Sequence, residues 1–383
     1  MDDARKLRVV RVCDSLAFAA LRPAWDDLLR RLPRRSVFHT HEWFDAAWQW
    51  RGQHASLNLL CAYAGDELVG IFPLVRETEI RCGLPCRILR FLSVPDTQLC
   101  DLICDPGNVP AACRSFAEAL LSAKDWDILN LHYLPENSLG AGPMAAELRK
   151  HGCAIESKAT GANPYIELQG DWEQYFATRT RSFKKAHNLA INRLNKAGRA
   201  EVKSFKGAQS EAQCALEQVI EISAHSWKRH TGNALDQAGP QAFIRRLQQL
   251  AADRGWWLMW LLALDGKSIA MECQLVYEGN IHALRADFVE GYPEISPGAY
   301  LNRELLVQSF GCGLQRYYMG PGDNAYKQRW AQGDEQVHEL TAYGPRLRAR
   351  GFALIDLRLK PFARRVRARF AHKEHVTEKD KET

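Results

Sequence analysis

The sequence predicts a mixed α/β protein made of two lobes with a similar layout, and three observations support this fold class. The chain has 383 residues, more than one hydrophobic core usually holds. Segments with helical spacing of apolar residues alternate with short apolar strands in both halves. A strand–turn–strand pattern occurs once in each half, at residues 57–75 and 256–277. We therefore expect lobes at residues 1–155 and 156–345, followed by a basic amphipathic helix and a polar tail at 346–383.

The composition indicates a globular protein of a reducing compartment. Apolar residues make up 46% and charged residues 25% of the chain, and the formal net charge is +6. The first ten residues carry charges where a secretory signal needs an apolar run. Eleven cysteines in a chain of this length are consistent with free thiols in a reducing compartment. We therefore expect a cytoplasmic location.

Each half is expected to contain helices, a hairpin, a further helix and a last strand, in that order. In the first half these elements are helices at 15–32 and 41–50, strands at 57–64, 68–75 and 87–94, a helix at 109–123 and a strand at 126–131. In the second half they are helices at 172–196, 210–230 and 240–254, strands at 256–264, 268–277 and 281–288, a helix at 297–312 and a strand at 316–319.

The two hairpins suggest an internal duplication, because the order of elements around them is the same. Aligning Gly65 with Gly266 gives five identities in a short window. A shift of one residue would instead align Gly70 with Ala270, so the sequence leaves the register open.

Glu272 is an unusual residue for the middle of an inner strand. In the strand at 268–277 it lies on the face opposite the expected core, and a buried carboxylate costs free energy unless it is paired. One interpretation is a structural hydrogen bond or an ion pair with Arg285 on the next strand. The other is that Glu272 lines a cleft and exchanges protons with a substrate.

Asp287 lies two residues after Arg285, near the end of the strand at 281–288. The ends of central strands are common positions for binding sites in open α/β sheets. Asp287 could serve such a site or cap the following loop, and the sequence does not separate these roles.

The segment Ser296-Pro297-Gly298 has the features of a helix start. Serine is a good N-cap, proline suits the first helical position, and glycine allows the backbone to approach a ligand. The free N–H groups of a helix start can bind phosphate, although an ordinary helix start has the same sequence.

A glycine-rich break at residues 320–322 precedes a short helix that contains Tyr326, Lys327 and Arg329. The tyrosine hydroxyl could protonate a leaving group, and the two basic residues could supply positive charge. Tyr326 could equally be a packing residue.

In this order these pieces resemble the GNAT acyltransferase superfamily, and in particular its tandem-GNAT branch with CelD/BcsL-like acetyltransferases and FemAB-like transferases. The resemblance rests on the basic segment 179–196, the turn Leu264-Asp265-Gly266, Ser296-Pro297-Gly298 and the segment 320–330. It covers residues 179–330 well and the first half through its order of elements, so it implies two GNAT-like lobes.

The resemblance implies direct attack of an acceptor amine or hydroxyl on the thioester of acetyl-CoA or another acyl-CoA. Glu272 or Asp287 would be the base and Tyr326 the acid. Residues expected to contact the co-substrate are Ser296, Gly298, Ala299, Tyr300 and Lys327. Residues expected to contact the acceptor are Lys184, Lys185, His225, Arg285 and Arg329. The first lobe would form a wall of the acceptor cleft, and no metal is expected.

The resemblance further implies an acyltransferase that acts on a sugar, a glycolipid or a related acceptor in envelope or exopolysaccharide synthesis. One alternative is a FemAB-like transferase that takes an aminoacyl group from tRNA, the only case in which a nucleic-acid partner is expected. Another is a non-catalytic scaffold of a polysaccharide synthase. The basic amphipathic helix near the C-terminus is equally consistent with contact to the inner face of a membrane and with docking on the protein itself.

Overall fold

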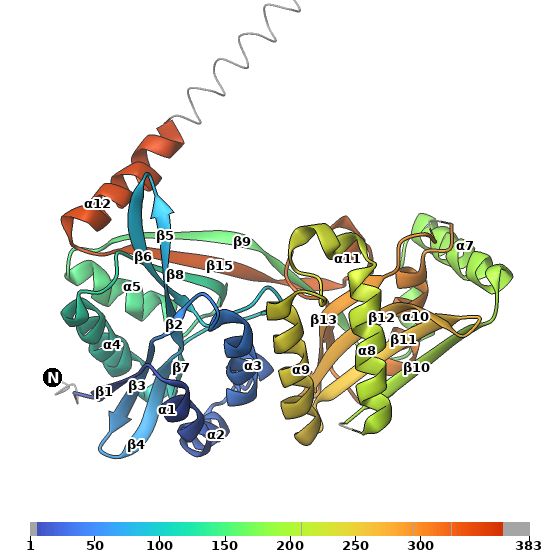
Figure 1. The fold of residues 1–383 in the computed structure, drawn as a ribbon, viewed down its shortest axis with the longest axis horizontal. Coiled ribbons are helices and arrows are strands. Elements are labelled where there is room, and N and C mark those ends of the chain that lie inside the picture. The colour runs from blue at the N-terminus through green and yellow to red at the C-terminus, as the bar shows by residue number, and fades with distance from the viewer. Residues whose placement is uncertain (1–5, 208, 293, 323, 363–383) are drawn as a thin grey trace, which may run out of the picture.

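The computed structural model describes residues 6–207, 209–292, 294–322 and 324–362, and it has two lobes side by side (Figure 1). A long sheet of eleven strands, ordered β10-β11-β12-β13-β14-β9-β15-β8-β6-β5-β2, runs through both lobes. A second sheet of four strands, ordered β1-β3-β4-β7, belongs to the first lobe. Within these described ranges, no helix is long and apolar enough to cross a membrane.

The first lobe packs its helices around the small sheet and one end of the long sheet. Its strands are β1 (Arg8–Val12), β2 (Ser56–Leu57), β3 (Leu59–Ala64), β4 (Glu67–Phe72), β5 (Leu74–Arg81), β6 (Leu84–Phe91), β7 (Ile103–Cys104) and β8 (Ile128–Pro135). Its helices are α1 (Ser15–Ala20), α2 (Arg22–Arg31), α3 (His41–Arg51), α4 (Val109–Ala123) and α5 (Ala141–Lys150).

The second lobe has helices on both faces of its strands. Residues of α8 and α9 share a core with Met271 and Cys273 on one face, and α10 packs on the other face with Tyr317. Its strands are β10 (Ala200–Lys206), β11 (Trp257–Leu264), β12 (Lys267–Tyr277), β13 (Asn280–Phe288) and β14 (Arg316–Tyr318). Its helices are α6 (Trp172–Ala177), α7 (Arg181–Ala197), α8 (Ser210–Ala224), α9 (Ala238–Asp253), α10 (Pro297–Ser309) and α11 (Ala325–Trp330).

Two long strands join the lobes, as Figure 1 shows. The strand β9 (Ala154–Glu167) pairs at its end with β14, and along most of its length with β15 (Gly333–Tyr343). In turn β15 pairs with β8 of the first lobe. The boundary expected between residues 155 and 156 therefore falls inside a strand, and β15 returns the chain to the first lobe before the helix α12 (Leu347–Leu354).

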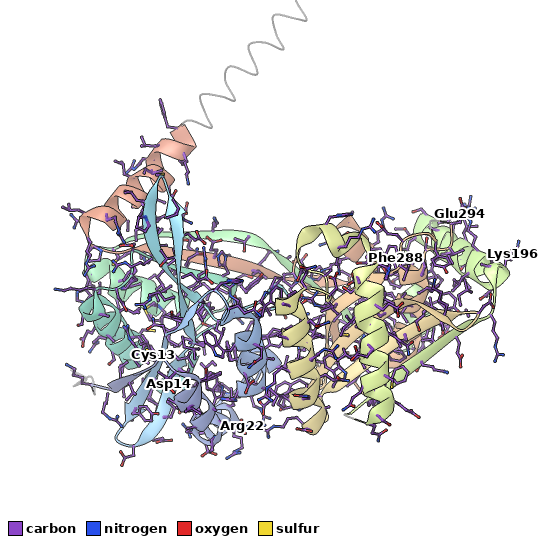
Figure 2. All side chains as sticks on the ribbon, viewed as in Figure 1. Cys13, Asp14, Arg22, Lys196, Phe288 and Glu294 are labelled. Carbon is purple, nitrogen blue, oxygen red and sulfur yellow. The ribbon has the colours of Figure 1, made fainter. Side chains whose placement is uncertain are left out.

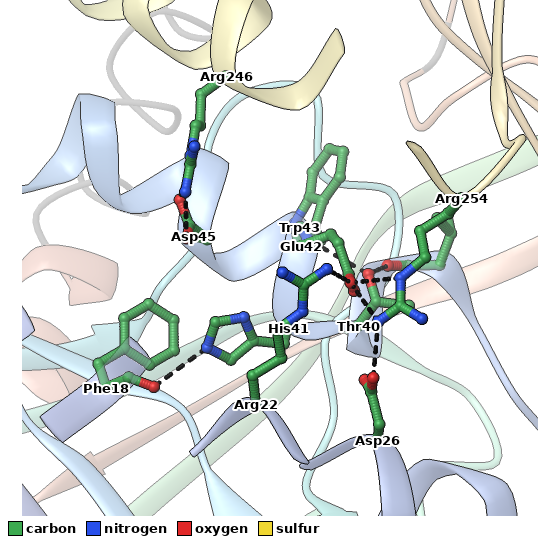
Figure 3. Close-up of polar contacts among 11 residues, drawn as sticks. Phe18, Arg22, Asp26, Thr40, His41, Glu42, Trp43, Asp45, Arg246 and Arg254 are labelled. Atoms are coloured by element: carbon green, nitrogen blue, oxygen red, sulfur yellow. Dashed lines mark hydrogen bonds and ion pairs between the residues drawn. The ribbon is translucent and has the colours of Figure 1, made fainter. Parts of the chain in front are cut away.

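The lobes also share a hydrophobic core and a set of ion pairs between α3 and α9 (Figure 3). The buried carboxylate of Glu42 accepts hydrogen bonds of 2.7 Å from Arg22 and from Arg254, and Asp45 pairs with Arg246 at 2.7 Å. Because these contacts connect the two halves, the lobes form one body rather than two domains on a linker.

The two hairpins have the same pairing register, and equivalent positions in the two lobes are 200 residues apart in the sequence. In the first hairpin Ala62 pairs with Gly70, and a bulge follows; in the second, Leu262 pairs with Ala270, and a bulge follows at the same place. The alignment of Gly65 with Gly266 is therefore wrong by one residue, because the bulge fixes the register.

Some expected elements differ in extent from those observed. The helix expected at 15–32 is divided at Leu21 into α1 and α2, since Pro23 starts a new helix. The helix expected at 210–230 ends at Ala224. Of the helix and tail expected at 346–383, the structure describes α12 and the π-helical turn Ile355–Leu359; residues 363–383 lie outside the described residues.

Candidate active site

A buried polar network lies between the sheet and α10 in the second lobe. Glu272 on β12 is 3% exposed, and its Oε1 accepts hydrogen bonds from the Tyr317 hydroxyl at 2.5 Å and from Gln274 Nε2 at 2.7 Å. The Trp260 indole donates to Gln274 Oε1 at 3.1 Å, and the Tyr317 hydroxyl is 3.4 Å from Asn302 Oδ1 on α10. Glu272 is thus hydrogen-bonded within a core that is otherwise largely apolar.

The environment of Glu272 favours its protonated form. Burial raises the pKa of its carboxyl from 4.5 to about 7, although the hydrogen bonds from Gln274 and Tyr317 and the charges of Lys228 and Lys327 act in the opposite direction. Burial and the neighbouring Glu272 raise the pKa of Tyr317 well above 10. Near neutral pH, therefore, Glu272 can take up or release a proton while Tyr317 stays neutral.

The short helix α11 places Tyr326 beside this network. Asn324 caps the helix, as its side chain accepts a hydrogen bond of 2.9 Å from the backbone of Tyr326. The residue is 39% exposed, but its hydroxyl interacts with the side chains of Asn302 and Trp330. Burial of that hydroxyl and the nearby Glu272 raise its pKa above the usual value, so Tyr326 remains a proton donor at neutral pH.

Lys327 lies where β13 and β14 part. The parallel pairing of these strands ends at His282 and Tyr318, while β13 continues to Phe288. The Lys327 ammonium donates to Gly320 O at 2.9 Å, and burial, helped by the charge of Lys228, lowers its pKa from 10.5 to about 8. The lysine can therefore also exchange a proton near neutral pH.

The first lobe reaches this point through Gln98. Its Nε2 donates to Ala283 O on β13 at 2.7 Å, and its Oε1 is 3.2 Å from His282 Nδ1. A Cβ added to Gly320, whose φ is +79°, would lie 3.5 Å from both Ala283 O and Gln98 Nε2. Residues of both lobes therefore converge at the divergence of the two strands.

Asp287 and Arg285 lie on the opposite face of the sheet from Glu272. Asp287 pairs with Lys228 at 2.7 Å and accepts a hydrogen bond from Ser223. Arg285 is 2.6 Å from Asp96 of the first lobe. One of the alternatives considered for Glu272, an ion pair with Arg285, is therefore wrong, because the pleat directs these two side chains to different faces of the sheet.

The start of α10 differs from the expected cap. Ser296 has a φ of +47°, an uncommon conformation for a residue other than glycine, and its side chain makes no capping hydrogen bond. Gly298 lies beneath Phe288, whose ring carbon would be 3.2 Å from an added Cβ. Figure 2 places Phe288 and Glu294 on this side of the second lobe. The neighbouring Ala299 donates its backbone N–H to Ser296 O.

The other candidates lie apart from Glu272 or at the edge of its network. Lys184 on α7 donates to Ala177 O at 2.7 Å, which ties α7 to α6. His225 is exposed at the end of α8, where its ring contacts Glu221 O. Lys185 and Arg329 are exposed on α7 and α11, and Tyr300 is half-buried in the first turns of α10.

Residues 181–328 match the family model described as an acetyltransferase (GNAT) domain. The second lobe is therefore similar in sequence to a GNAT acetyltransferase domain. The match lies inside the segment 179–330 on which the resemblance rested, and it supports an acyltransferase of the GNAT type. No curated protein matches the sequence.

Solved structures show the same fold over almost the whole chain. FemX has a TM-score of 0.56 at 8% identity and covers 91% of this chain and 99% of its own. The C-terminal domain of a putative lysylphosphatidylglycerol synthetase from Agrobacterium fabrum has a TM-score of 0.53 at 13% identity, covering 89% and 96%. A tandem GNAT protein from the clavulanic acid biosynthesis pathway has a TM-score of 0.52 at 13% identity, and the match covers 89% of this chain and 100% of that protein. The chain therefore has the tandem-GNAT fold.

Several residues of the polar network around Glu272 were not predicted from the sequence. Tyr317 and Asn302 contact or adjoin Glu272, and Gln98 comes from the other lobe. The run Tyr317-Tyr318 was visible, but only the pairing of β14 with β13 decides which tyrosine faces α10. Among the described residues, no group of three or more His, Cys, Asp or Glu side chains is arranged to hold a metal ion.

Proposed function

We propose that this GNAT protein transfers an acyl group from acyl-CoA to an amine or hydroxyl of a sugar, a glycolipid or a related acceptor in envelope or exopolysaccharide synthesis. The observation that carries the proposal is the buried network of Glu272, Tyr317 and Asn302 beside Tyr326 and Lys327. It lies at the divergence of β13 and β14, within the matched acetyltransferase domain.

Glu272 supports the role of proton acceptor better than Asp287 does. A carboxylate with a pKa of about 7 can accept a proton at neutral pH, directly or through a chain of water molecules. Asp287 forms an ion pair with Lys228 and lies on the other face of the sheet. We assign to Asp287 the role of holding Lys228 and to Glu272 that of the base.

Tyr326 is the proposed acid. The acceptor atom forms a bond to the thioester carbon, the carbon–sulfur bond breaks, and the sulfur takes up a proton as CoA leaves. The Tyr326 hydroxyl stays protonated at neutral pH because of its raised pKa, so it can supply that proton. Lys327, one residue further, adds positive charge near the developing negative charge.

The start of α10 is the proposed site for the CoA diphosphate, with contacts from Ser296, Gly298, Ala299, Tyr300 and Lys327. The N-terminal end of a helix attracts anions through its N–H groups and its dipole. Among the described residues, a Cβ added at Gly298 would have only the ring of Phe288 within 4 Å, and this side chain is 38% exposed. This ring can move aside for a ligand, because it is not packed in the core.

The first lobe is proposed as a wall of the acceptor cleft. Gln98 and Asp96 hold the middle of β13 through Ala283 and Arg285, so the first lobe shapes the place where the strands part. For acceptor binding we retain Lys184, Lys185, His225, Arg285 and Arg329. Of these, Arg285 would act by holding the lobes together, since Asp96 and Asn233 already occupy its guanidinium.

A second candidate is a FemAB-like transferase that takes its aminoacyl group from tRNA. The unusual start of α10 favours it, because Ser296 makes no cap and Glu294 adds an exposed carboxylate close to the proposed diphosphate site. The fold similarity to FemX over 91% of the chain is consistent with the same candidate. A scaffold without activity is the third.

Calorimetric titration with acetyl-CoA and longer acyl-CoAs tests the proposal. We expect binding by the wild-type protein and by Tyr326→Phe, and loss of binding by Gly298→Asp, which adds a negative charge beside the diphosphate. Phe288→Ala is the matched control, since it opens the same position without a charge. Acceptor-free release of the CoA thiol, measured in parallel, should be lost in Tyr326→Phe. Binding of aminoacyl-tRNA without binding of any acyl-CoA would favour the second candidate and contradict the first.

A further inference from the structure

Exposed apolar side chains are concentrated at one end of the first lobe. Of the eleven large apolar side chains that are exposed among the described residues, six lie on the β5–β6 hairpin tip or on the C-terminal helical segment 347–362. These six are Ile80, Leu84, Leu347, Leu354, Leu359 and Phe362. Ile80 is 72% and Phe362 is 67% exposed, and the exposure of their apolar surface to water is unfavourable in free energy.

The two elements are neighbours in space. In Figure 1 the hairpin and α12 project together from the first lobe. Arg81 in the hairpin donates to Asp356 in the turn Ile355–Leu359 at 3.2 Å, and the Tyr343 hydroxyl donates to the same carboxylate at 3.1 Å. The exposed apolar residues of both elements therefore belong to one surface, which we call the apical surface.

The geometry of α12 separates a packed side from an outward side. Phe352 and Ala353 are buried against the sheet residues Ile88 and Ile128. Leu347 and Leu354 are spaced by seven residues within α12, which places them together on the side opposite Phe352. Phe362 follows the π-helical turn and is also exposed. These exposed side chains therefore do not contribute to the packing of the first lobe.

The apical surface is positively charged. Between residues 346 and 362 the chain has five basic residues and one acidic residue, Asp356, which is already paired with Arg81 and Lys360. Arg350 and Arg358 are exposed on this segment, whereas Arg348 is paired with the buried Asp127. Apolar side chains surrounded by arginine and lysine match a membrane surface with anionic lipids, where the apolar groups enter the interface and the cations meet the headgroups.

We infer that the apical surface docks the protein on an anionic lipid membrane, through the hairpin tip and the segment 347–362 together. The inference is independent of the reaction proposed above, since Glu272 and Tyr326 lie in the other lobe. It involves a pre-formed surface with two elements, rather than a single helix that would fold on the membrane.

Vesicle co-sedimentation of the full chain tests this inference. We expect the wild-type protein to pellet with vesicles of phosphatidylcholine and phosphatidylglycerol, and far less with phosphatidylcholine alone or at high salt. The double variant Ile80→Ser/Leu84→Ser and the double variant Leu354→Ser/Phe362→Ser should each weaken the partition at least tenfold. The matched control is Leu16→Ser/Leu139→Ser, which removes two exposed leucines elsewhere on the first lobe and should leave partition unchanged.

The outcomes separate the inference from its alternatives. An effect of the segment variant without an effect of the hairpin variant would overturn the two-element surface. Absence of wild-type binding to anionic vesicles, with self-association that the same variants abolish, would show that a second copy covers the surface instead. Circular dichroism spectra that match the wild type will show that the exposed substitutions leave the fold intact, and acyl-CoA binding should be the same in all variants.

Discussion

Positions 72 and 272 occupy the same place in the hairpins of the two lobes, and they carry phenylalanine and glutamate. Leu60 pairs with Phe72 in the first hairpin, and Trp260 pairs with Glu272 in the second. Phe72 contacts Phe91 and Phe116 in the core, with ring centroids 5.7 and 5.8 Å apart. The position that the first lobe uses for aromatic packing therefore holds the central carboxylate of the polar network in the second lobe.

This comparison supports the proposal that the second lobe performs the chemistry. A buried carboxylate costs free energy even when it is hydrogen-bonded, so a lobe selected for stability alone has no reason to keep one. The first lobe instead supplies Gln98 and Asp96, which contact the middle of β13. We therefore propose that the first lobe supports the second, which holds the proposed site.

The largest effect is expected for Glu272→Gln, which keeps the shape of the side chain and removes its titration. The maximal rate should fall by about 10²–10⁴-fold, the usual contribution of a general base. In the wild type the rate should rise with pH through about 7, because Glu272 is active only after it loses its proton. The pH dependence of CoA thiol release, measured with and without the substitution, checks this.

Stability gives an independent measurement on the same variant. The folded-state pKa of Glu272 lies above its unfolded value of 4.5, so the wild type loses stability as the pH rises from about 4.5 to above 7. The glutamine variant cannot lose that stability and should be the more stable protein at alkaline pH. If Asp287→Asn removed the pH dependence while Glu272→Gln kept it, the assignment of the two carboxylates would have to be exchanged.

The same position in the first lobe should affect stability and leave the chemistry unchanged. Phe72→Ala removes a ring that is 2% exposed, and we expect the free energy of unfolding to fall by about 3–5 kcal/mol. Phe288→Ala, on the exposed end of β13, is the control and should cost far less. Urea unfolding measures both. A pH profile altered in the folded Phe72→Ala protein would mean that the first lobe takes part in proton transfer.

The support given by the first lobe can be measured through Gln98→Ala. Ala283 O would lose the hydrogen bond of 2.7 Å from Gln98 in a partly buried place, and the free energy of unfolding should fall by about 1–3 kcal/mol. Gln53→Ala, in an exposed loop of the same lobe, should have almost no effect. Equal unfolding curves for the two variants would show that the contact between Gln98 and β13 contributes nothing to stability.

Much of the fold and part of the candidate site could be predicted from the sequence. The hairpin turns, the strand with Glu272 and the helix with Tyr326 could be predicted from local patterns, because each depends on neighbouring residues. The pairing of β15 with β9 and with β8 of the first lobe could not be predicted, since an apolar strand does not specify its partner. Tyr317 was missed for the same reason: its hydroxyl reaches Glu272 across 45 residues of chain, and only the strand order β12-β13-β14 brings them together.

The smallest effect is expected for Tyr317→Phe, and it tests whether the polar network tunes Glu272. The tyrosine hydroxyl donates to the carboxylate and thereby lowers the pKa of Glu272, against the effect of burial. Without this hydrogen bond the pKa should move further above 7, by about one unit, since a hydrogen bond to a charged group is worth about 1.5–3 kcal/mol and part of it persists in the neutral form. The rise of the rate with pH should shift to higher pH, with the rate at alkaline pH nearly restored. Tyr318→Phe is the matched control, because its hydroxyl bonds to Glu335 on β15 and not to Glu272. A rate that falls equally at every pH would assign Tyr317 to proton transfer itself and not to the positioning of Glu272.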